Sequence, residues 1–351
     1  LHAHVMRLGL ADEVSLANSI MHVYVRCGRT KLAWRILQRL QGRDVISWST
    51  VIADSSQLSC ELFVSMRRQG EKVDEYPLSS LLSACGNTAI LEVGKQLHAL
   101  SVHTGLRRID SIQSSLINMY AKSGHIIEAS RVFHEGENNN LVSYTAIIKG
   151  YADHGFFKEA VRLFEKMGAD ELRPDAVTFI GVLSACSHAG MVNAAFRLFN
   201  SMIGYGITPW KEHVGCMVDL LCRVGRLEEA EGMIARMRYE EEEEVLWSML
   251  LRGCRMYCDV ERGARAAAKI LQLVPNCAWT LITVANLYAV VGRWKEAGAI
   301  RKTMNAMGLN KEPGWSWIGF NHQIVTFFSG DCFHPKLTEM HAILELIAKS
   351  K

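Results

Sequence analysis

Proline is scarce in this chain, with only 6 among 351 residues, so long helices can run uninterrupted. Long apolar runs are missing as well: no stretch approaches the roughly 18 residues that suggest a membrane-spanning helix. Neither sign of charge dominates, because 39 basic and 36 acidic side chains leave a net charge of +3. This mild basicity is compatible with nucleic acid but is too weak to argue for it.

Paired cysteines are also lacking. The chain has 10 cysteines but no Cys-x-x-Cys, and 13 histidines but no His-x-Glu. Cys85, Cys186 and Cys254 lie inside helical patterns, where a thiol behaves as a small apolar group. We therefore expect structural thiols in a reducing compartment, with no disulfide framework, no metal site and no cofactor. The chain begins with Leu1 and shows no targeting segment, and we expect it to be the C-terminal part of a longer protein.

Two stretches of the chain carry nearly the same text. "YAKSGHIIEASRVF" begins at Tyr120, and "YADHGFFKEAVRLFEKM" begins 31 residues later at Tyr151. Their glycines start a series with steps of 31, 35 and 35 residues: Gly124, Gly155, Gly190 and Gly225. Another 67 residues lead to Gly292, which makes two steps with Cys258 in the intermediate slot. A period of 31–35 residues indicates a solenoid of helical pairs.

Each unit follows one physical pattern. In "SYTAIIKGYADHG" the apolar residues fall at helical spacing, and the final glycine ends the helix because it tolerates left-handed backbone. "FFKEAVRLFEKM" then begins a second helix with its own apolar face. One pair cannot bury both faces, but stacked pairs can, and stacking also creates an extended groove.

The units resemble pentatricopeptide repeats, in particular the plant subclass that alternates P-, L- and S-type repeats. The residues that carry the resemblance include "NSIMHVYVRCGRTKLAWRIL", "SLINMYAKSGHIIEASRVF", "RPDAVTFIGVLSACSHAGMV" and "EHVGCMVDLLCRVGRLEEAEGMI". The resemblance covers essentially the whole chain. It implies an all-α fold, a right-handed α-solenoid of tandem helix-turn-helix repeats, with a short hairpin-plus-helix tail.

The resemblance also divides the chain. Tandem repeats are expected over residues 1–242. Residues 243–312, which contain "VLWSMLLRGCRMYCDVERG" and "ITVANLYAVVGRWKEAG", resemble the E motifs, which are helical pairs similar to tetratricopeptide repeats. Residues 313–351 alternate like a hairpin and then read as a helix. They resemble either the E+ extension or the truncated start of a DYW-type deaminase domain.

Proteins of this kind bind single-stranded RNA in mitochondria or chloroplasts, one base per repeat, and most of those with E motifs specify sites of cytidine-to-uridine editing. In the family, the fifth and last residues of a repeat read the base, and an aliphatic second residue sandwiches it. The resemblance assigns the sandwiching role to Val142 and Val177. It assigns base reading to Asn18/Asp44 (uridine), Ser49/Asp74 (guanosine), Ser114/Asn140 (adenosine) and Thr145/Asp175 (guanosine).

Hydrogen-bond chemistry supports these pairs. Uracil N3 and guanine N1 carry hydrogens and suit an Asp acceptor, whereas adenine N1 and cytosine N3 suit an Asn donor. Because the family binds RNA parallel to repeat order, the predicted target is 5′-U-(G)-N-A-G-N; the units with Ser79/Ile109 and Ile180/Trp210 carry no readable pair. Asn, Asp and Thr at helix starts are also ordinary capping residues.

One unit departs from the pattern. Residues 45–74 form a unit of only 30 residues, five fewer than the 35 expected, and the missing piece falls where the turn between the two helices should be. Five residues are more than one helical turn. We therefore expect imperfect packing or an altered register here, which puts base reading by Ser49 and Asp74 in doubt.

Catalysis by the chain itself is not expected. Zinc-dependent deamination needs His-x-Glu followed by Pro-Cys-x-x-Cys, and the sequence contains neither His-x-Glu nor Cys-x-x-Cys. The leading hypothesis is an RNA-editing specificity factor whose E/E+ region recruits a deaminase-bearing partner or another editing factor. Three alternatives stay open: an RNA splicing or stability factor, a protein-interaction scaffold, and a decayed gene fragment.

Overall fold

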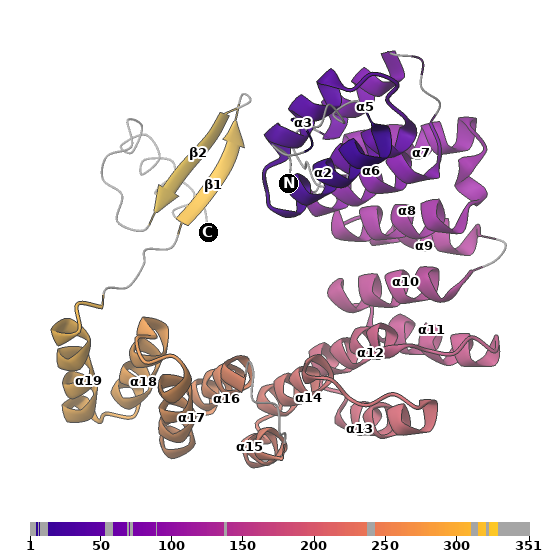
Figure 1. The fold of residues 1–351 in the computed structure, drawn as a ribbon. Helices are drawn as coiled ribbons and strands as arrows, with labels where there is room; N and C mark the ends of the chain where they lie inside the picture. Colours follow the sequence, from indigo (N-terminus) through magenta and orange to yellow (C-terminus); the bar gives the residue numbers. More distant parts are fainter. Residues whose placement is uncertain are drawn as a thin grey trace, which may run out of the picture. The chain divides into compact units, whose positions relative to one another are not determined.

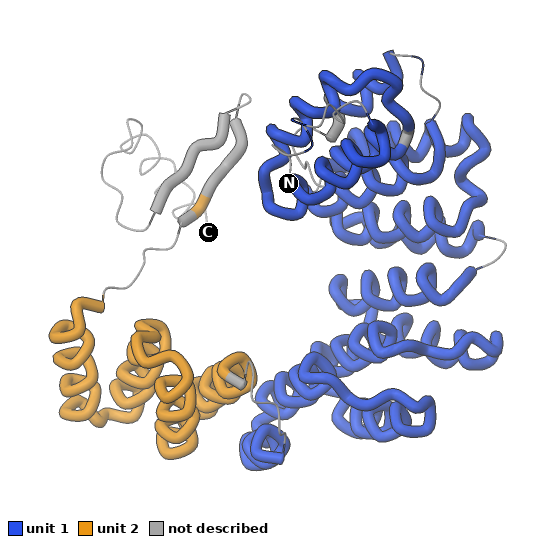
Figure 2. Tube along the Cα trace, in the orientation of Figure 1, with its two compact units in different colours: residues 1–241 blue, residues 242–351 orange. Residues whose placement is uncertain are grey.

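The computed structural model describes residues 5, 7, 13–52, 59–68, 70, 73–88, 90–136, 139–236, 243–309, 315–320 and 323–328. The chain divides into two compact units, residues 1–241 and residues 242–351 (Figure 2). Each unit is described by itself.

Unit 1 consists of helical pairs in chain order (Figure 1). The first helices of the pairs are α2 (Val14–Arg26), α4 (Val45–Ile52), α6 (Glu75–Thr88), α8 (Asp110–Lys122), α10 (Leu141–Asp153), α12 (Ala176–Ala189) and α14 (Lys211–Arg223). The second helices are α3 (Thr30–Arg39), α5 (Ser59–Arg68), α7 (Leu91–His103), α9 (Ile126–His134), α11 (Phe157–Ala169), α13 (Val192–Ser201) and α15 (Leu227–Ala235). Two 3₁₀ turns, η1 (Leu106–Arg108) and η2 (Met202–Tyr205), precede α8 and α14.

The first helices form a continuous layer, because each packs against the first helices before and after it. The second helices form another layer; α9 and α11, for example, each pack on their own first helix and on the next one. The core lies between the layers and continues from pair to pair, with large side chains such as Trp48, Ile148 and Phe179 fully buried. The predicted all-α repeat fold is confirmed.

The turn inside each pair forms as the glycine series predicts. Gly155 follows α10 with φ = 83°, and Gly124, Gly190 and Gly225 have φ values of 84°, 67° and 79°. After Gly155, the backbone N–H of Phe156 donates to the carbonyl of Tyr151 at 2.9 Å, which closes the helix end. A side chain at such a φ is strained in any residue with a Cβ, so glycine is favoured at this slot.

The shortened unit is visible in its helix lengths. Its first helix, α4, has 8 residues, whereas α8 and α10 have 13 each. The segment 53–58, where the deletion was placed, lies outside the described residues. The unit nevertheless contributes to the core, because Trp48, Val51, Ile52 and Met66 are fully buried.

Unit 2 contains α16 (Glu243–Tyr257), α17 (Val260–Leu273), α18 (Ala278–Val290) and α19 (Trp294–Ala306), followed by strands β1 (Trp315–Phe320) and β2 (Gln323–Phe328). Helix α16 packs on α17, and α18 packs on α19, so the region again consists of helical pairs. The strands form an antiparallel hairpin in which Trp315 pairs with Phe328 and Phe320 with Gln323. The helix predicted after the hairpin falls in residues 329–351, outside the described residues.

Cys258 occupies a glycine position of the repeat, as its spacing predicts. Its φ is 56°, a left-handed value that is uncommon for a residue with a side chain. The backbone N–H of Asp259 donates to the carbonyl of Cys254 at 3.0 Å, so this turn is closed in the same way as the turn at Gly155. The repeat geometry therefore imposes strain on this cysteine.

Replacing Cys258 by glycine is expected to stabilise the chain by about 0.5–1 kcal/mol. Relief of the left-handed strain is worth roughly 1–2 kcal/mol, and the greater backbone freedom of unfolded glycine offsets part of it. Urea denaturation measures the change. Cys258→Ala, which keeps the strain and removes the thiol, is the control and should leave the stability unchanged; equal stabilisation by both variants would contradict this account.

Candidate nucleic-acid interface

The predicted last-position residues lie at the starts of the first helices, where three of them act as N-caps. Asn140 Oδ1 accepts from the backbone N–H of Ser143 at 3.0 Å, and Asp175 Oδ1 accepts from that of Thr178 at 2.8 Å. Asp44 Oδ1 accepts from the backbone N–H of Ser47 at 2.7 Å. Such a cap contributes about 1 kcal/mol. Capping occupies one oxygen of each side chain and fixes its orientation.

A hydroxyl bridge connects Thr145 to Asp175. Thr178 Oγ1 donates to Asp175 Oδ1 at 2.7 Å and lies 2.7 Å from Thr145 Oγ1. A hydroxyl has one hydrogen, and that of Thr178 is directed at Asp175, so the Thr145 hydroxyl must donate to Thr178. Thr145 Oγ1 therefore keeps a lone pair that can accept a hydrogen bond. Asp175 Oδ2 can accept as well, because the hydrogen bonds from Thr178 both go to Oδ1.

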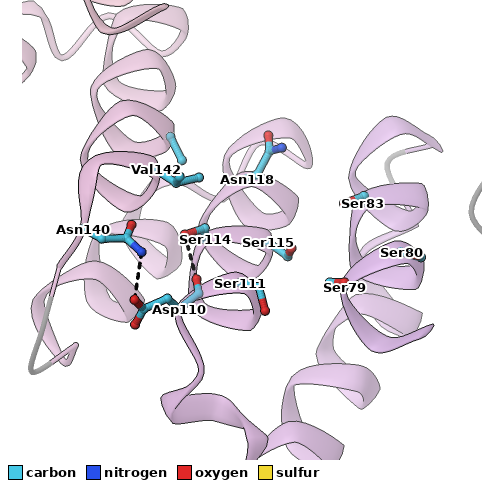
Figure 3. A pocket seen from close by; sticks show the side chains of 11 residues that line it. Ser79, Ser80, Ser83, Asp110, Ser111, Ser114, Ser115, Asn118, Asn140 and Val142 are labelled. Atoms are coloured by element: carbon cyan, nitrogen blue, oxygen red, sulfur yellow. Dashed lines mark hydrogen bonds between the residues drawn. The ribbon is translucent and has the colours of Figure 1, made fainter. Parts of the chain in front are cut away.

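Ser114 and Asn140 are connected through Ser143. Ser114 Oγ donates to the backbone carbonyl of Asp110 at 2.8 Å, so in its 3.0 Å contact with Ser143 Oγ it acts as the acceptor. Asn140 contacts Asp110 too: its Nδ2 donates to Asp110 Oδ2 at 3.0 Å (Figure 3). The structure thus brings the predicted pair together with two residues that the sequence reasoning did not name, Asp110 and Ser143.

Asn18 and Asp44 meet directly. Asn18 Nδ2 donates to Asp44 Oδ1 at 3.4 Å, and Ser47 Oγ donates to the same oxygen at 2.7 Å. Burial raises the pKa of the Asp44 carboxyl, but the hydrogen bonds from Ser47 and Asn18 outweigh it and hold the pKa below its ordinary value. Asp44 is therefore ionised at neutral pH and is an acceptor only.

Asp74 caps α6 in a different way. Asp74 Oδ1 accepts from the backbone N–H of Tyr76 at 3.1 Å. The position that carries Ser47, Ser143 or Thr178 after the other caps is here Pro77, which has neither an N–H nor a hydroxyl. This unit, which is also the shortened one, cannot form the hydroxyl bridge of the other units.

Exposed apolar side chains lie two residues after each of these caps. Val142 and Val177, the predicted sandwiching residues, are 60% and 48% exposed. Ile46 and Tyr76 occupy the same position in their units and are 62% and 64% exposed. The sequence reasoning did not name Ile46 or Tyr76, although their spacing from Asp44 and Asp74 was the signal that could have found them.

A pocket of about 680 Å³ lies beside the Ser114/Asn140 pair (Figure 3). Helices α6 and α8 contribute six serines to its lining: Ser79, Ser80, Ser83, Ser111, Ser114 and Ser115. Asp110, Asn140 and Val142 complete one side of it. Hydroxyl and amide groups around an open pocket, with one exposed aliphatic side chain, suit a flat polar ring such as a nucleobase.

Other chemistry finds little support in the described residues. They hold no group of three or more His, Cys, Asp or Glu side chains that could bind a metal ion. Burial raises the pKa of the Cys186 thiol to about 11 and that of Cys216 to about 12, so both thiols stay protonated at neutral pH. Among the described helices, none has the length and apolar content needed to cross a membrane.

Comparison with known families matches the repeats and the region after them. The PPR repeat model matches residues 16–45, 114–141, 177–207 and 213–241. A second PPR repeat family model matches residues 139–188, and the E motif model matches residues 257–319.

The curated relatives are pentatricopeptide repeat-containing proteins of Arabidopsis thaliana. One is 47% identical over 99% of this chain and 50% of its own length, and another is 38% identical over 98% of this chain and 72% of its own length. The chain spans about half the length of several relatives it matches, some of which are named chloroplastic or mitochondrial.

A solved structure shares the fold. The crystal structure of the pentatricopeptide repeat protein PPR10 in complex with an 18-nucleotide psaJ RNA element superposes with a TM-score of 0.68 at 17% identity, over 81% of this chain and 44% of that one. With the repeat matches and the relatives, this shows that the chain belongs to the pentatricopeptide repeat family and carries an E motif.

Proposed function

We propose that this chain is a sequence-specific single-stranded RNA-binding protein that selects sites for organellar cytidine-to-uridine editing. The observation that carries the proposal is the arrangement at the first-helix starts of three repeats. There a capping Asp or Asn, a bridging hydroxyl, a fifth-position side chain and an exposed aliphatic residue lie together, as at Asp175, Thr178, Thr145 and Val177.

Base reading follows from the groups left over after capping. At the Thr145/Asp175 site, guanine N1–H can donate to Asp175 Oδ2, and the guanine amino group can donate to Thr145 Oγ1. At the Asn18/Asp44 site, uracil N3–H can donate to the ionised Asp44 carboxylate. Exposed aliphatic side chains such as Val177 give the base an apolar surface to lie against. Each site thus offers hydrogen-bond groups for one base edge and a surface for its face.

The E region supplies the second part of the proposal. We propose that residues 1–242 bind RNA, and that residues 243–312 with the tail 313–351 recruit a deaminase in trans. The E motif match at residues 257–319 supports this division, as does the separation into compact units at residues 241 and 242. Localisation to a mitochondrion or chloroplast is proposed from relatives named for these organelles.

Direct binding to a designed RNA tests the proposal. A labelled single-stranded RNA with UGNAGN at its centre should bind the purified chain roughly tenfold more tightly than the same RNA with cytidine in place of the second G of UGNAGN, because one base-edge match is worth about 1–3 kcal/mol. Fluorescence anisotropy at fixed salt measures both affinities, since phosphate contacts make binding salt-dependent. Equal affinity for both RNAs, or no binding by a folded chain, would refute the RNA-reading role.

A further inference from the structure

The carboxylate of Asp110 lies beside the amide that is predicted to read adenosine. Asn140 Nδ2 donates to Asp110 Oδ2 at 3.0 Å, although the two residues are 30 positions apart (Figure 3). Asp110 is the first residue of its repeat and is exposed, and it lines the same pocket as Ser114 and Asn140. Neither the fifth position nor the last position of the repeat includes it.

Two contacts fix the orientation of the Asn140 amide. Its Oδ1 accepts from the backbone N–H of Ser143, and its Nδ2 faces the Asp110 carboxylate. Reversing the amide would set Nδ2 against the Ser143 N–H and Oδ1 against a carboxylate oxygen, so both contacts would become repulsive. One Nδ2 hydrogen goes to Asp110 and the other stays available.

The two side chains therefore present a donor and an acceptor next to each other. The donor is the second Nδ2 hydrogen of Asn140, and the acceptor is a remaining lone pair of the Asp110 carboxylate. Adenine offers the complement on its Watson–Crick edge, with N1 as acceptor and the N6 amino group as donor. Guanine and uracil offer the reverse, so each would set a carbonyl oxygen against the carboxylate and an N–H against the amide.

We propose that Asp110 is a third base-reading side chain of this repeat, which accepts from the exocyclic amino group of the base and excludes guanosine and uridine. The inference rests on the proposed function, whose adenosine reader it extends. Cytosine matches the same donor–acceptor couple through N3 and N4, and the small Ser114 hydroxyl at the fifth position favours the purine. In the two other bridged units the first residue is apolar, Val14 or Leu141, so this carboxylate distinguishes one site.

An acidic residue in the first turn of a helix also stabilises the helix dipole. Asp110 has that role in α8, and Glu128 has it in α9 of the same repeat. Glu128→Ala therefore removes the same kind of helix stabilisation without touching the pocket. It serves as the matched control for Asp110→Ala.

Four RNAs, UGNXGN with X as each base, test the inference by measured Kd. The wild type and Glu128→Ala should prefer A over G at X, and Asp110→Ala should reduce that preference roughly tenfold. Asn140→Asp alone sets two carboxylates side by side, which repel each other, so it should bind every base at X more weakly. The double variant Asp110→Asn/Asn140→Asp should regain affinity with the preference inverted toward G and U, because donor and acceptor have changed places.

The outcomes separate this inference from the proposed function. If Asp110→Ala keeps the wild-type preference at X, or if Asn140→Asp alone converts the preference fully, Asp110 does not read the base. The preference for G at the Thr145/Asp175 offset, measured with the same chain, then shows whether RNA reading itself still holds. A folded wild type with no preference at either offset would overturn both.

Discussion

Replacing Thr145 by asparagine is expected to change the base preferred at its offset from guanosine to uridine, with a shift in relative affinity of roughly tenfold to hundredfold. The Thr145 hydroxyl donates to Thr178, so its oxygen can accept from the guanine amino group, which uracil lacks. An asparagine amide is longer and offers N–H donors, which suit the carbonyl oxygens of the smaller uracil. Asp175 still accepts from N3–H of uracil as it does from N1–H of guanine.

Competition binding with RNAs that differ only at this offset measures the change. Thr145→Ser keeps the hydroxyl and its bond to Thr178, so this matched variant should keep the guanosine preference. Asp175→Asn keeps the capping oxygen but replaces the second acceptor by a donor, and it should lose that preference. A Thr145→Asn chain that still prefers guanosine would show that Thr145 is a structural residue only.

Replacing Phe179 by alanine is expected to destabilise unit 1 by about 3–5 kcal/mol. Phe179 is fully buried in α12, where its ring centroid lies 5.1 Å from that of Phe164 and 5.6 Å from that of Tyr205. The ring therefore joins α12 to α11 and to the turn η2, and its removal leaves a cavity among three elements. Because repeats contact only their neighbours, the loss should be concentrated near α11–α13.

Hydrogen exchange with residue resolution, together with urea denaturation, tests this expectation. Val177→Ala changes an exposed side chain on the same helix and should alter stability by no more than about 0.5 kcal/mol. It should nevertheless weaken RNA binding, because Val177 is proposed to lie against the base. A Phe179→Ala chain that loses protection equally in α2 and α12 would contradict the repeat-by-repeat account.

Much of the fold was predictable because it depends on local rules. Glycine spacing marked the turns, and the left-handed φ of Cys258 shows that the spacing located the slot even without a glycine. The shortened first helix α4 and the hairpin of β1 and β2 also followed from length and alternation. These features depend on residues close in sequence, where period and backbone preference decide the structure.

The candidate site was predictable only in part. Capping by Asn140 and Asp175 is local, but the contacts from Asn140 to Asp110 and from Thr145 to Thr178 join residues 30 and 33 positions apart. Such contacts arise from the stacking of one repeat on the next, which no single unit encodes. The hydroxyl three residues after the cap was still a usable signal, since Ser47, Ser143 and Thr178 carry it and Pro77 does not.

A selection of single-stranded RNA from a randomised pool by the purified wild-type chain tests the central claim most directly. The account predicts enrichment of U, A and G at the relative spacing U-N-N-A-G, with the shortened unit contributing the least at its own offset. A chain shown by cooperative thermal unfolding to be folded, yet enriching no bases at these offsets, would contradict it and direct attention to protein partners of the helical repeats.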